Sequence, residues 1–263
     1  MLTKKQLREF TRFSHELALE AGQLLLRKSR KTGTVQYKGR VNLVTDADLA
    51  SEKKIVAAIS RTWPDHSILA EEGAAREKKS DFRWIIDPLD GTTNFAHNFP
   101  FYCVSIALEY RDEIICGTVY DPEREELYYA ARGNGAFLNR KRISVSKSTK
   151  LEKSLLATGF PYDIGTSSEN NLGNFNRFAQ KAQAIRRAGS AALDLCYLAC
   201  GRFDGFWELK LHPWDTAAGR VIVEEAGGRV TDFQGRKYSI YDKYILVSNG
   251  RIHGQMRHLL NQK

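Results

Sequence analysis

Two aspartates three residues apart, Asp87 and Asp90, are the side chains with the clearest capacity for chemistry. They follow the apolar run Trp84-Ile85-Ile86, which predicts a buried strand, and Pro88 fixes the backbone between them. Gly91-Thr92-Thr93 then predicts the start of a helix, where backbone N–H groups stabilise an anion such as phosphate. Two carboxylates beside an anion repel each other unless a cation lies between them. Oxygen ligands of this kind select a hard divalent ion, and Mg²⁺ is the natural candidate beside a phosphate.

Two further carboxylates stand at positions that could belong to the same site. Glu71 follows the apolar segment 67–70, and Asp215 begins a segment of small residues that predicts a helix. Each has a structural alternative, because an adjacent Glu-Glu pair is usually a solvated face and an Asp at a helix start is usually a cap. Asp87 and Asp90 could likewise be turn residues that cap backbone amides. The segments taken singly leave both interpretations open.

Composition restricts the class of protein. The chain has 263 residues, of which 42% are apolar and 27% charged, and this balance excludes a disordered or collagen-like chain. The formal charge is +9, and the excess is local, since residues 1–40 carry ten basic and three acidic side chains. With neither a linker nor an internal repeat in the sequence, we expect a single unit, 1–263, made of two lobes, 1–150 and 151–263, that share one site.

Cysteines and apolar runs indicate the compartment. The four cysteines are too few for a disulfide scaffold and form no CxxC pair, and Cys196 and Cys200 are predicted to be buried. No apolar run approaches the ~20 residues that a membrane span needs. The first residues lead into an amphipathic pattern and lack a signal-peptide core. We therefore expect a cytoplasmic protein that does not enter a membrane.

The periodicity of apolar residues predicts the elements that must position the carboxylates. Helices are predicted from Thr3 and from Thr45, the second ending before Trp63-Pro64, and the stretch up to Arg40 is predicted to be a loop or hairpin. Short strands rich in Ile, Val, Tyr and Phe follow over 67–70, 83–86, 101–110, 113–120 and 127–131, and their spacing favours an antiparallel meander. In the second half, helices over 171–182, 190–199, 215–226 and 252–260 alternate with strands over 184–187, 205–209, 228–231 and 244–248, which predicts layered α/β structure.

Four motifs follow one another along the chain. They are Val44 to Asp48, Ala70 to Gly73, Trp84 to His97 with the core Asp-Pro-Leu-Asp-Gly-Thr-Thr-Asn-Phe, and Trp214 to Gly228 with Trp-Asp-Thr-Ala-Ala-Gly. In this order they resemble the inositol monophosphatase family, a group of Mg²⁺-dependent, lithium-sensitive phosphatases, over nearly the whole chain. The resemblance implies a layered α/β/α/β/α sandwich of the sugar phosphatase type, usually a homodimer.

The same resemblance implies a set of metal ligands. One Mg²⁺ is expected on Glu71, Asp87 and the backbone carbonyl of Leu89, and a second on Asp87, Asp90 and Asp215. A third, weaker ion near Glu71 is typical of the family, so two or three ions per site are expected. Asp87 is then the bridging ligand, a position between two cations that only an anionic group can fill at low energetic cost.

The resemblance also implies a reaction, the hydrolysis of a small phosphate monoester by direct attack of metal-activated water. Glu71 and Thr92 are expected to position and deprotonate that water, and Asp48 to accept a hydrogen bond from Thr92. The backbone N–H groups of Gly91 and Thr92 are expected to hold phosphate oxygens. Metals are needed because water is a poor nucleophile and a phosphate dianion repels hydroxide. No covalent phosphoenzyme is implied.

The residues that the resemblance assigns to the substrate point to a polyol. Glu208 stands seven residues before Asp215, the spacing at which family members carry a Glu that binds ring hydroxyls. The segment Gly189-Ser190-Ala191 matches one whose backbone lines the sugar pocket, and Asp90 and Asp215 are expected to contact substrate as well. Inositol 1-phosphate, cleaved to myo-inositol and phosphate, is the expected substrate. Lys38 and Arg40 either attract the anionic substrate or are only solvated.

Two alternatives remain open at this stage. Relatives with nearly the same metal motifs hydrolyse fructose 1,6-bisphosphate, histidinol phosphate or 3'-phosphoadenosine 5'-phosphate, and the metal ligands do not separate these substrates. In the other alternative the chain is an RNA- or protein-binding partner with secondary phosphatase activity. The basic N-terminal excess, Arg140-Lys141-Arg142 and Arg186-Arg187 favour that alternative, whereas no RNA-binding motif is recognisable.

Overall fold

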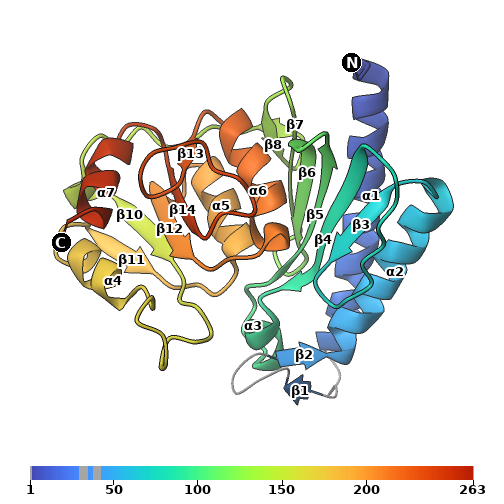
Figure 1. Cartoon of the computed structure of the whole chain (residues 1–263), viewed down its shortest axis with the longest axis horizontal. Coiled ribbons are helices and arrows are strands. Elements are labelled where there is room, and N and C mark those ends of the chain that lie inside the picture. Colours follow the sequence, from blue (N-terminus) through green and yellow to red (C-terminus); the bar gives the residue numbers. More distant parts are fainter. Residues whose placement is uncertain (1, 30–34, 38–42, 263) are drawn as a thin grey trace.

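The computed structural model describes residues 2–29, 35–37 and 43–262 (Figure 1). Lys38 and Arg40, which the sequence offered as attractors of an anionic substrate, lie outside these described residues. The short strands β1 (Val35–Tyr37) and β2 (Leu43–Thr45) pair antiparallel on either side of that gap. Of the helices that the structure describes, none combines the length and the apolar character needed to cross a membrane.

A seven-stranded sheet is built in chain order from the first part of the chain. Its strands are β3 (Ser67–Ala70), β4 (Phe82–Asp90), β5 (Cys103–Tyr110), β6 (Glu113–Asp121), β7 (Glu126–Ala131), β8 (Ala136–Leu138) and β9 (Lys141–Arg142). From β4 onward every neighbouring pair is antiparallel, as a meander requires. The meander prediction is wrong for β3, which pairs parallel to β4. Alternation of apolar residues identifies a strand but carries no information on its direction.

Two long helices, α1 (Lys4–Ser29) and α2 (Asp46–Thr62), cover the outer face of this sheet (Figure 1). Both begin where the sequence predicted. Thr3 and Gln6 form the reciprocal hydrogen bonds of a capping box before α1, and Thr45 caps α2 together with Asp48. The helix α2 ends at Thr62, next to Trp63-Pro64, where the residue before a proline disfavours helical backbone.

A second sheet of five strands has the order β11-β10-β12-β14-β13. Its strands are β10 (Leu155–Thr158), β11 (Ala184–Arg186), β12 (Gly205–Leu209), β13 (Arg229–Thr231) and β14 (Tyr244–Ser248), and the 3-10 turn η1 (Leu151–Lys153) precedes β10. The strand β10 was not predicted, because its four residues are too few to establish a period of two. The other strands of this sheet lie where they were predicted.

The helices complete a five-layered arrangement that matches the predicted α/β/α/β/α sandwich (Figure 1). The helices α5 (Ala191–Ala199) and α6 (Pro213–Glu225) lie between the sheets, and α4 (Leu172–Ala179) and α7 (His253–Leu260) lie on the outer face of the second sheet. The division into two lobes near residue 150 stays a prediction.

Glycines bring α6 close to its neighbours. A Cβ atom on Gly117 of β6 would lie 2.7 Å from the Cα of Ala218, and one on Gly219 would lie 2.5 Å from the Leu195 side chain of α5. Both distances are far shorter than a carbon–carbon contact allows. Only glycine therefore permits this packing, which sets the height of α6 and of Asp215 in its first turn above the first sheet.

Candidate active site

Asp87 and Asp90 both lie on β4, which continues past the predicted strand end to Asp90. The pairing of β4 with β5 shifts register between these two residues, at the position of Pro88, which has no N–H to donate to a ladder. Asp87 is only 1% exposed, and its Oδ1 accepts a hydrogen bond from the Leu89 N–H at 3.0 Å. The bulge thus lets both aspartates of one strand face the same site.

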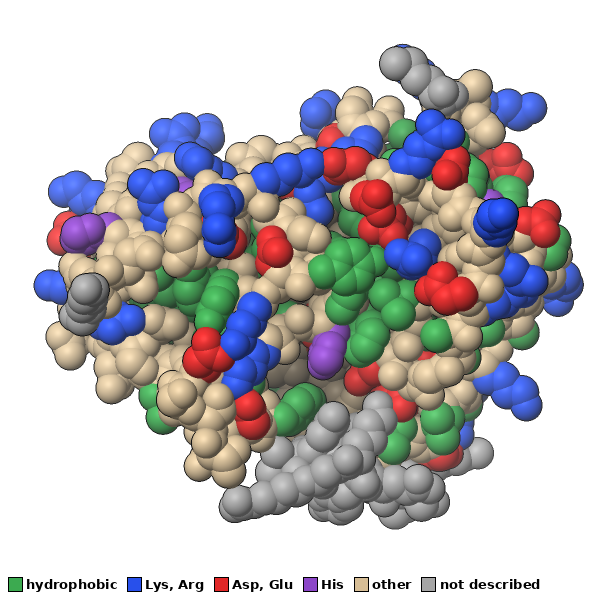
Figure 2. Space-filling view, in the orientation of Figure 1, with side chains coloured by type: hydrophobic (Ala, Val, Ile, Leu, Met, Phe, Trp, Pro, Cys, Tyr) green, Lys and Arg blue, Asp and Glu red, His purple; other side chains and the backbone are tan. Residues whose placement is uncertain are grey.

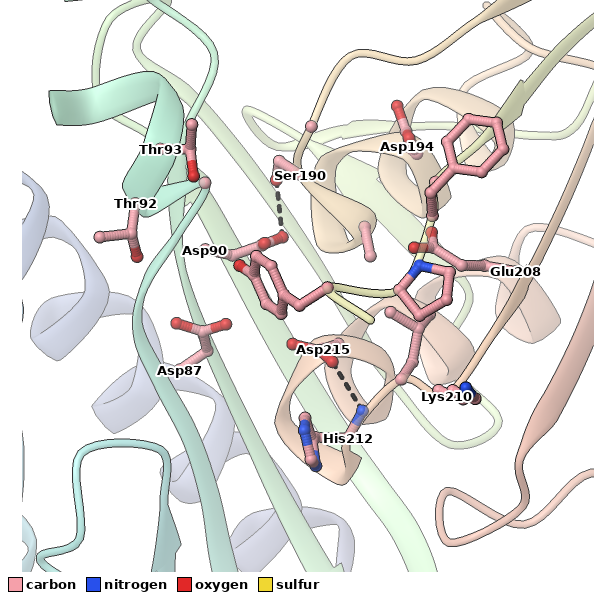
Figure 3. A pocket seen from close by; sticks show the side chains of 18 of the residues that line it. Asp87, Asp90, Thr92, Thr93, Ser190, Asp194, Glu208, Lys210, His212 and Asp215 are labelled. Carbon is pink, nitrogen blue, oxygen red and sulfur yellow. Dashed lines mark hydrogen bonds between the residues drawn. The ribbon is translucent and has the colours of Figure 1, made fainter. Parts of the chain in front are cut away.

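Asp215 reaches the site from the opposite layer. It lies in the first turn of α6, and its Oδ2 accepts a hydrogen bond from the His212 N–H at 2.6 Å (Figure 3). Asp215 is not the N-cap itself, which is His212, but the third residue of α6, whose carboxylate returns a hydrogen bond to the N-cap backbone. The same side chain also points toward Asp87 and Asp90, so capping fixes its direction and does not exclude a second role.

The three aspartates form a compact acidic cluster. Asp87, Asp90 and Asp215 each offer one carboxylate oxygen, and these oxygens lie within 4.8 Å of one another. Burial raises the pKa of Asp90 to about 6. It raises the pKa values of Asp87 and Asp215 well above the usual range, and neighbouring carboxylates add to both shifts. Such a cluster favours a divalent cation, because a cation removes the repulsion that burial has strengthened.

Glu71 and Thr92 border the cluster. Glu71 follows β3, and because β3 is parallel to β4, its end lies at the same sheet edge as Asp87; its charge is the first of the neighbouring charges that raise the pKa of Asp87. The Oγ1 of Thr92, the first residue of α3 (Thr92–Ala96), donates to Asp48 Oδ1 at 3.0 Å and to the Leu89 carbonyl at 3.1 Å. Glu71 and Thr92 both line the same cavity as the aspartates.

The cavity, of about 550 Å³, extends from the acidic cluster to a second group of polar residues. Glu208 of β12 lies there, 8% exposed, and burial raises its pKa to about 8. A Cβ atom on Gly159 would lie 2.1 Å from Glu208 Oε1, so a side chain at position 159 would displace this carboxyl group. Gly189, Ser190 and Ala191, at the start of α5, line the cavity between the two groups. Figure 3 shows Asp87 and Glu208 on opposite sides of the view.

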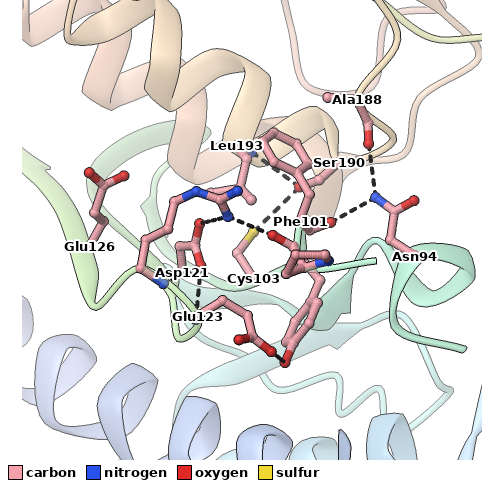
Figure 4. A network of polar contacts seen from close by, with 12 residues as sticks. Asn94, Phe101, Cys103, Asp121, Glu123, Glu126, Ala188, Ser190 and Leu193 are labelled. Carbon is pink, nitrogen blue, oxygen red and sulfur yellow. Dashed lines mark hydrogen bonds and ion pairs between the residues drawn. The ribbon is translucent and has the colours of Figure 1, made fainter. Parts of the chain in front are cut away.

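Hydrogen bonds join the two sides of the cavity. Ser190 Oγ and the Ala192 N–H donate to Asp90 Oδ2 at 2.6 and 2.7 Å, so the start of α5 holds a carboxylate of β4. Asn94 Nδ2 donates to the carbonyls of Phe101 and Ala188 at 2.7 and 2.8 Å (Figure 4). These bonds fix α3 and α5 relative to each other, which predetermines the width of the cavity.

Among the residues that the structure describes, all those that the sequence singled out for the site line this cavity, except Asp48, which contacts it through Thr92. Further residues that line the cavity were missed, among them Gly159, Asp194 and Arg187, the last of which the sequence placed only in a basic patch. Asp194 had a usable signal, since it is an acidic residue within the otherwise apolar helix Ala191–Ala199. Gly159 had none, because its role depends on Glu208, which lies 49 residues away in the sequence.

The fold and the site together define a class, a layered α/β protein with a carboxylate cluster suited to divalent cations beside a polar cavity. The model of the inositol monophosphatase family matches residues 6–263. The chain is 45% identical to the inositol-1-monophosphatase of Synechocystis over 99% of this chain and 91% of the relative. It is 43% identical to the Nus factor SuhB of Pseudomonas aeruginosa over 88% of each chain.

A solved structure agrees with the sequence comparison. The extragenic suppressor protein suhB of Bartonella henselae has 40% identity and a TM-score of 0.91, over 97% of this chain and 99% of that chain. The chain therefore belongs to the inositol monophosphatase family, as its four motifs predicted. It is a phosphatase of this metal-dependent family, and the structure contains the acidic cluster of Asp87, Asp90 and Asp215 described above.

Proposed function

We propose that this protein hydrolyses small phosphate monoesters with Mg²⁺ and that inositol 1-phosphate is its preferred substrate. The observation that carries the proposal is the cluster of Asp87, Asp90 and Asp215, whose oxygens converge from two layers of the fold at one end of the cavity. Glu208 at the other end supplies a buried carboxyl group that can bind a hydroxyl. A substrate that joins a phosphate to a polyol ring fits both ends.

The residues at the cluster fit Mg²⁺, because every donor is a hard oxygen. Glu71, Asp87 and the Leu89 carbonyl would hold one ion, and Asp87, Asp90 and Asp215 a second. When bound, Mg²⁺ acidifies water and neutralises the charge of the phosphate and the leaving oxygen. The presence of two ions, and of a third near Glu71, is part of the proposal.

Glu71 and Thr92 would position the attacking water and take its proton. The one hydroxyl hydrogen of Thr92 is shared between Asp48 and the Leu89 carbonyl, so the oxygen is free to accept a hydrogen bond from the water. Asp48 is held in turn by the N–H of Thr45 at 2.8 Å. These bonds orient the hydroxyl before substrate arrives, and the carboxylate of Glu71 supplies the base.

The start of α3 and of α5 would bind the substrate. Gly91 and Thr92 line the cavity next to the cluster, and the first amides of a helix have no partner within the helix. Gly91 has a φ of 97°, and its missing Cβ would lie 2.9 Å from the Phe101 carbonyl, so the backbone approaches closely only as glycine. The segment Gly189-Ser190-Ala191 would border the ring, with Glu208 bound to its hydroxyls and Asp90 and Asp215 nearest the ester.

Phosphate release from a panel of esters tests the proposal. The panel holds inositol 1-phosphate, fructose 1,6-bisphosphate, histidinol phosphate and 3'-phosphoadenosine 5'-phosphate, each measured as kcat/KM with Mg²⁺ and with EDTA. We expect the highest value for inositol 1-phosphate and no release with EDTA. A higher value for another ester would overturn the substrate assignment, while the proposed reaction would still hold. Phosphate release that EDTA does not reduce would overturn the metal assignment.

A second candidate function is binding to RNA or to a protein, favoured by the 43% identity to a protein named as a Nus factor. Arg140, Lys141, Arg142, Arg186 and Arg187 are exposed. On the face drawn in Figure 2, however, Lys and Arg side chains are spread out with acidic side chains among them. RNA affinity at about 50 mM salt, with a steep decline as salt rises, would support this function. If the protein did not bind RNA at that salt concentration, RNA binding would be excluded as its function.

The proposal also includes the oligomeric state and the cellular location of the protein. Homodimer formation, which the family resemblance implies, is tested by sedimentation equilibrium across a range of protein concentrations. A single species at the mass of one chain throughout that range would contradict it. The cytoplasmic location is tested by fractionation of cells that express the chain.

A further inference from the structure

Asp194 is a buried carboxyl group whose surroundings do not account for it. It lies in α5 and is 2% exposed, and Leu193 and Leu195 on either side are fully buried. Its Oδ1 accepts no hydrogen bond from any residue within the described parts of the chain. Most buried polar atoms in folded proteins have a partner, and a buried oxygen without one costs about 1–3 kcal/mol. Such a group calls for an explanation beyond packing.

Helix capping does not explain Asp194. The N-cap of α5 is Ser190, whose Oγ accepts from the Leu193 N–H at 3.3 Å. Asp194 lies in the first turn of α5, where the helix dipole favours an acidic side chain, but typically by less than the cost of burying a carboxyl oxygen without a partner. An apolar residue of similar size would suit this helix better, because the alanines and leucines around it are buried. The carboxyl group therefore stays unexplained by the stability of α5.

The surroundings of Asp194 belong to the polar end of the cavity. Asp194, Glu208 and Arg187 all line the cavity. Figure 3 shows Asp194 on the same side of the view as Glu208 and away from Asp87. Burial raises the pKa of Asp194 well above its usual range; the charge of Glu208 adds to this rise, and the charge of Arg187 opposes it. The charge of Asp90 in the acidic cluster also reaches both carboxyl groups, so Asp194 and Glu208 form the polar end of the same cavity.

We infer that Asp194 is a specificity-determining residue that binds a second substrate hydroxyl, next to the hydroxyl bound by Glu208. The inference rests on the proposed function and narrows its substrate class to phosphate esters of polyols with two neighbouring hydroxyls. Hydroxyls suit this pair because each can donate to one carboxyl group and accept from another donor. A ligand ammonium group suits it less, because the guanidinium of Arg187 lies beside the same carboxyl groups.

The test compares inositol 1-phosphate with cyclohexyl phosphate, which has the same ring without hydroxyls. We expect Asp194→Ala to lower kcat/KM for inositol 1-phosphate by about tenfold or more and to change that for cyclohexyl phosphate by less than about twofold. Asp194→Asn keeps an acceptor oxygen and is expected to fall between Asp194→Ala and the unaltered enzyme. Most of the change should be in KM, since the reacting atoms lie at the other end of the cavity.

Asp121→Asn is the matched control, since Asp121 is a fully buried carboxylate outside the cavity, bound to Arg124 at 3.0 Å. It is expected to lower Tm without changing the ratio of the two kcat/KM values. If Asp194→Ala remained active and its ratio of kcat/KM for inositol 1-phosphate to that for cyclohexyl phosphate were unchanged, the role of Asp194 would be overturned. If the unaltered enzyme cleaved cyclohexyl phosphate but not inositol 1-phosphate, the proposed function would fail and the subsite with it.

Discussion

Asp215 illustrates how one side chain serves both the fold and the site. Its hydrogen bond with the His212 N–H caps α6, and the same carboxylate completes the acidic cluster. Asp90 is similar, because the bonds from Ser190 and Ala192 connect β4 to α5 and also fix the carboxylate oxygen. A structural and a chemical role of one aspartate therefore do not exclude each other, although the sequence alone left them as alternatives.

Glu208 gives a pH prediction at the residue scale. Its pKa is about 8 in the folded protein against an ordinary 4.5, so the folded state holds this proton more tightly. The resulting stability is present below about pH 4.5 and is lost as pH rises toward 8. Burial lowers the pKa of His15 and of His253 to about 4, and both histidines act in the opposite direction only below about pH 6.5.

Between pH 6.5 and 8, therefore, the two histidines no longer change the stability, and its pH dependence reports on the carboxyl groups. As pH rises from 6.5 to 8, the free energy of unfolding of the metal-free protein should fall. We expect this fall to be about 2 kcal/mol smaller in Glu208→Gln than in the unaltered protein. Urea unfolding at each pH in EDTA measures both curves. Parallel curves would show that Glu208 does not titrate there.

Thr92 gives a second prediction at this scale. Thr92→Val keeps the shape of the side chain and removes the hydroxyl that donates to Asp48 at 3.0 Å. We expect kcat to fall by about 10²-fold or more with a small change in KM, because positioning of the water is lost while the substrate still binds. Thr92→Ser keeps the hydroxyl and is the control, expected to retain most of the activity. A Val variant as active as the Ser variant would exclude Thr92 from the reaction.

At the scale of elements, the packing of α6 on β6 positions Asp215. A Cβ on Gly117 would lie 2.7 Å from Ala218, so Gly117→Ala should push α6 outward. We expect a loss of about 1–3 kcal/mol in stability and weaker Mg²⁺ binding, although Gly117 does not line the cavity. Calorimetric Mg²⁺ titration and Tm measure the two effects.

Gly254→Ala is the matched control for that variant. Gly254 lies within α7, and an added Cβ would meet nothing within 4 Å. The same substitution there should raise stability by about 0.5–1 kcal/mol and leave Mg²⁺ affinity unchanged. If Gly117→Ala also left Mg²⁺ affinity unchanged, the position of α6 would not set the geometry of the cluster.

The elements also show what the sequence can and cannot predict. Helix starts at Thr3 and Thr45 were predictable because capping residues act within four positions of the chain. The parallel pairing of β3 with β4 was not, since direction depends on the path of the whole segment that connects them. For the same reason the motifs identified Glu71, Asp87 and Asp215 as candidates, while Gly159 emerged only from a contact between distant residues.

At the scale of the whole molecule, the site joins elements that the layers would otherwise keep apart. Two of the clustered carboxylates come from β4 of the first sheet and the third from α6, which lies between the sheets. Their mutual repulsion in the metal-free protein acts against the closure of these layers. A cation bound among them should therefore stabilise the fold as well as supply chemistry.

Thermal unfolding tests this linkage. We expect Mg²⁺ to raise Tm, with a stabilisation of about 2.7 kcal/mol once its concentration reaches about 100 times Kd. NaCl at the same ionic strength controls for general screening and should have a much smaller effect. Equal shifts with both salts would mean that no specific cation site exists.

The central claim is that Asp87 bridges metal ions that drive phosphate release. Measuring kcat as a function of Mg²⁺ concentration tests this claim most directly. Phosphate release from inositol 1-phosphate would be followed for the unaltered enzyme and for Asp87→Asn, with circular dichroism to verify that both are folded. We predict that the folded variant retains less than about a tenth of kcat at every Mg²⁺ concentration, a barrier increase above about 1.4 kcal/mol. A variant that retained more than a tenth would contradict the bridging role and the account built on it.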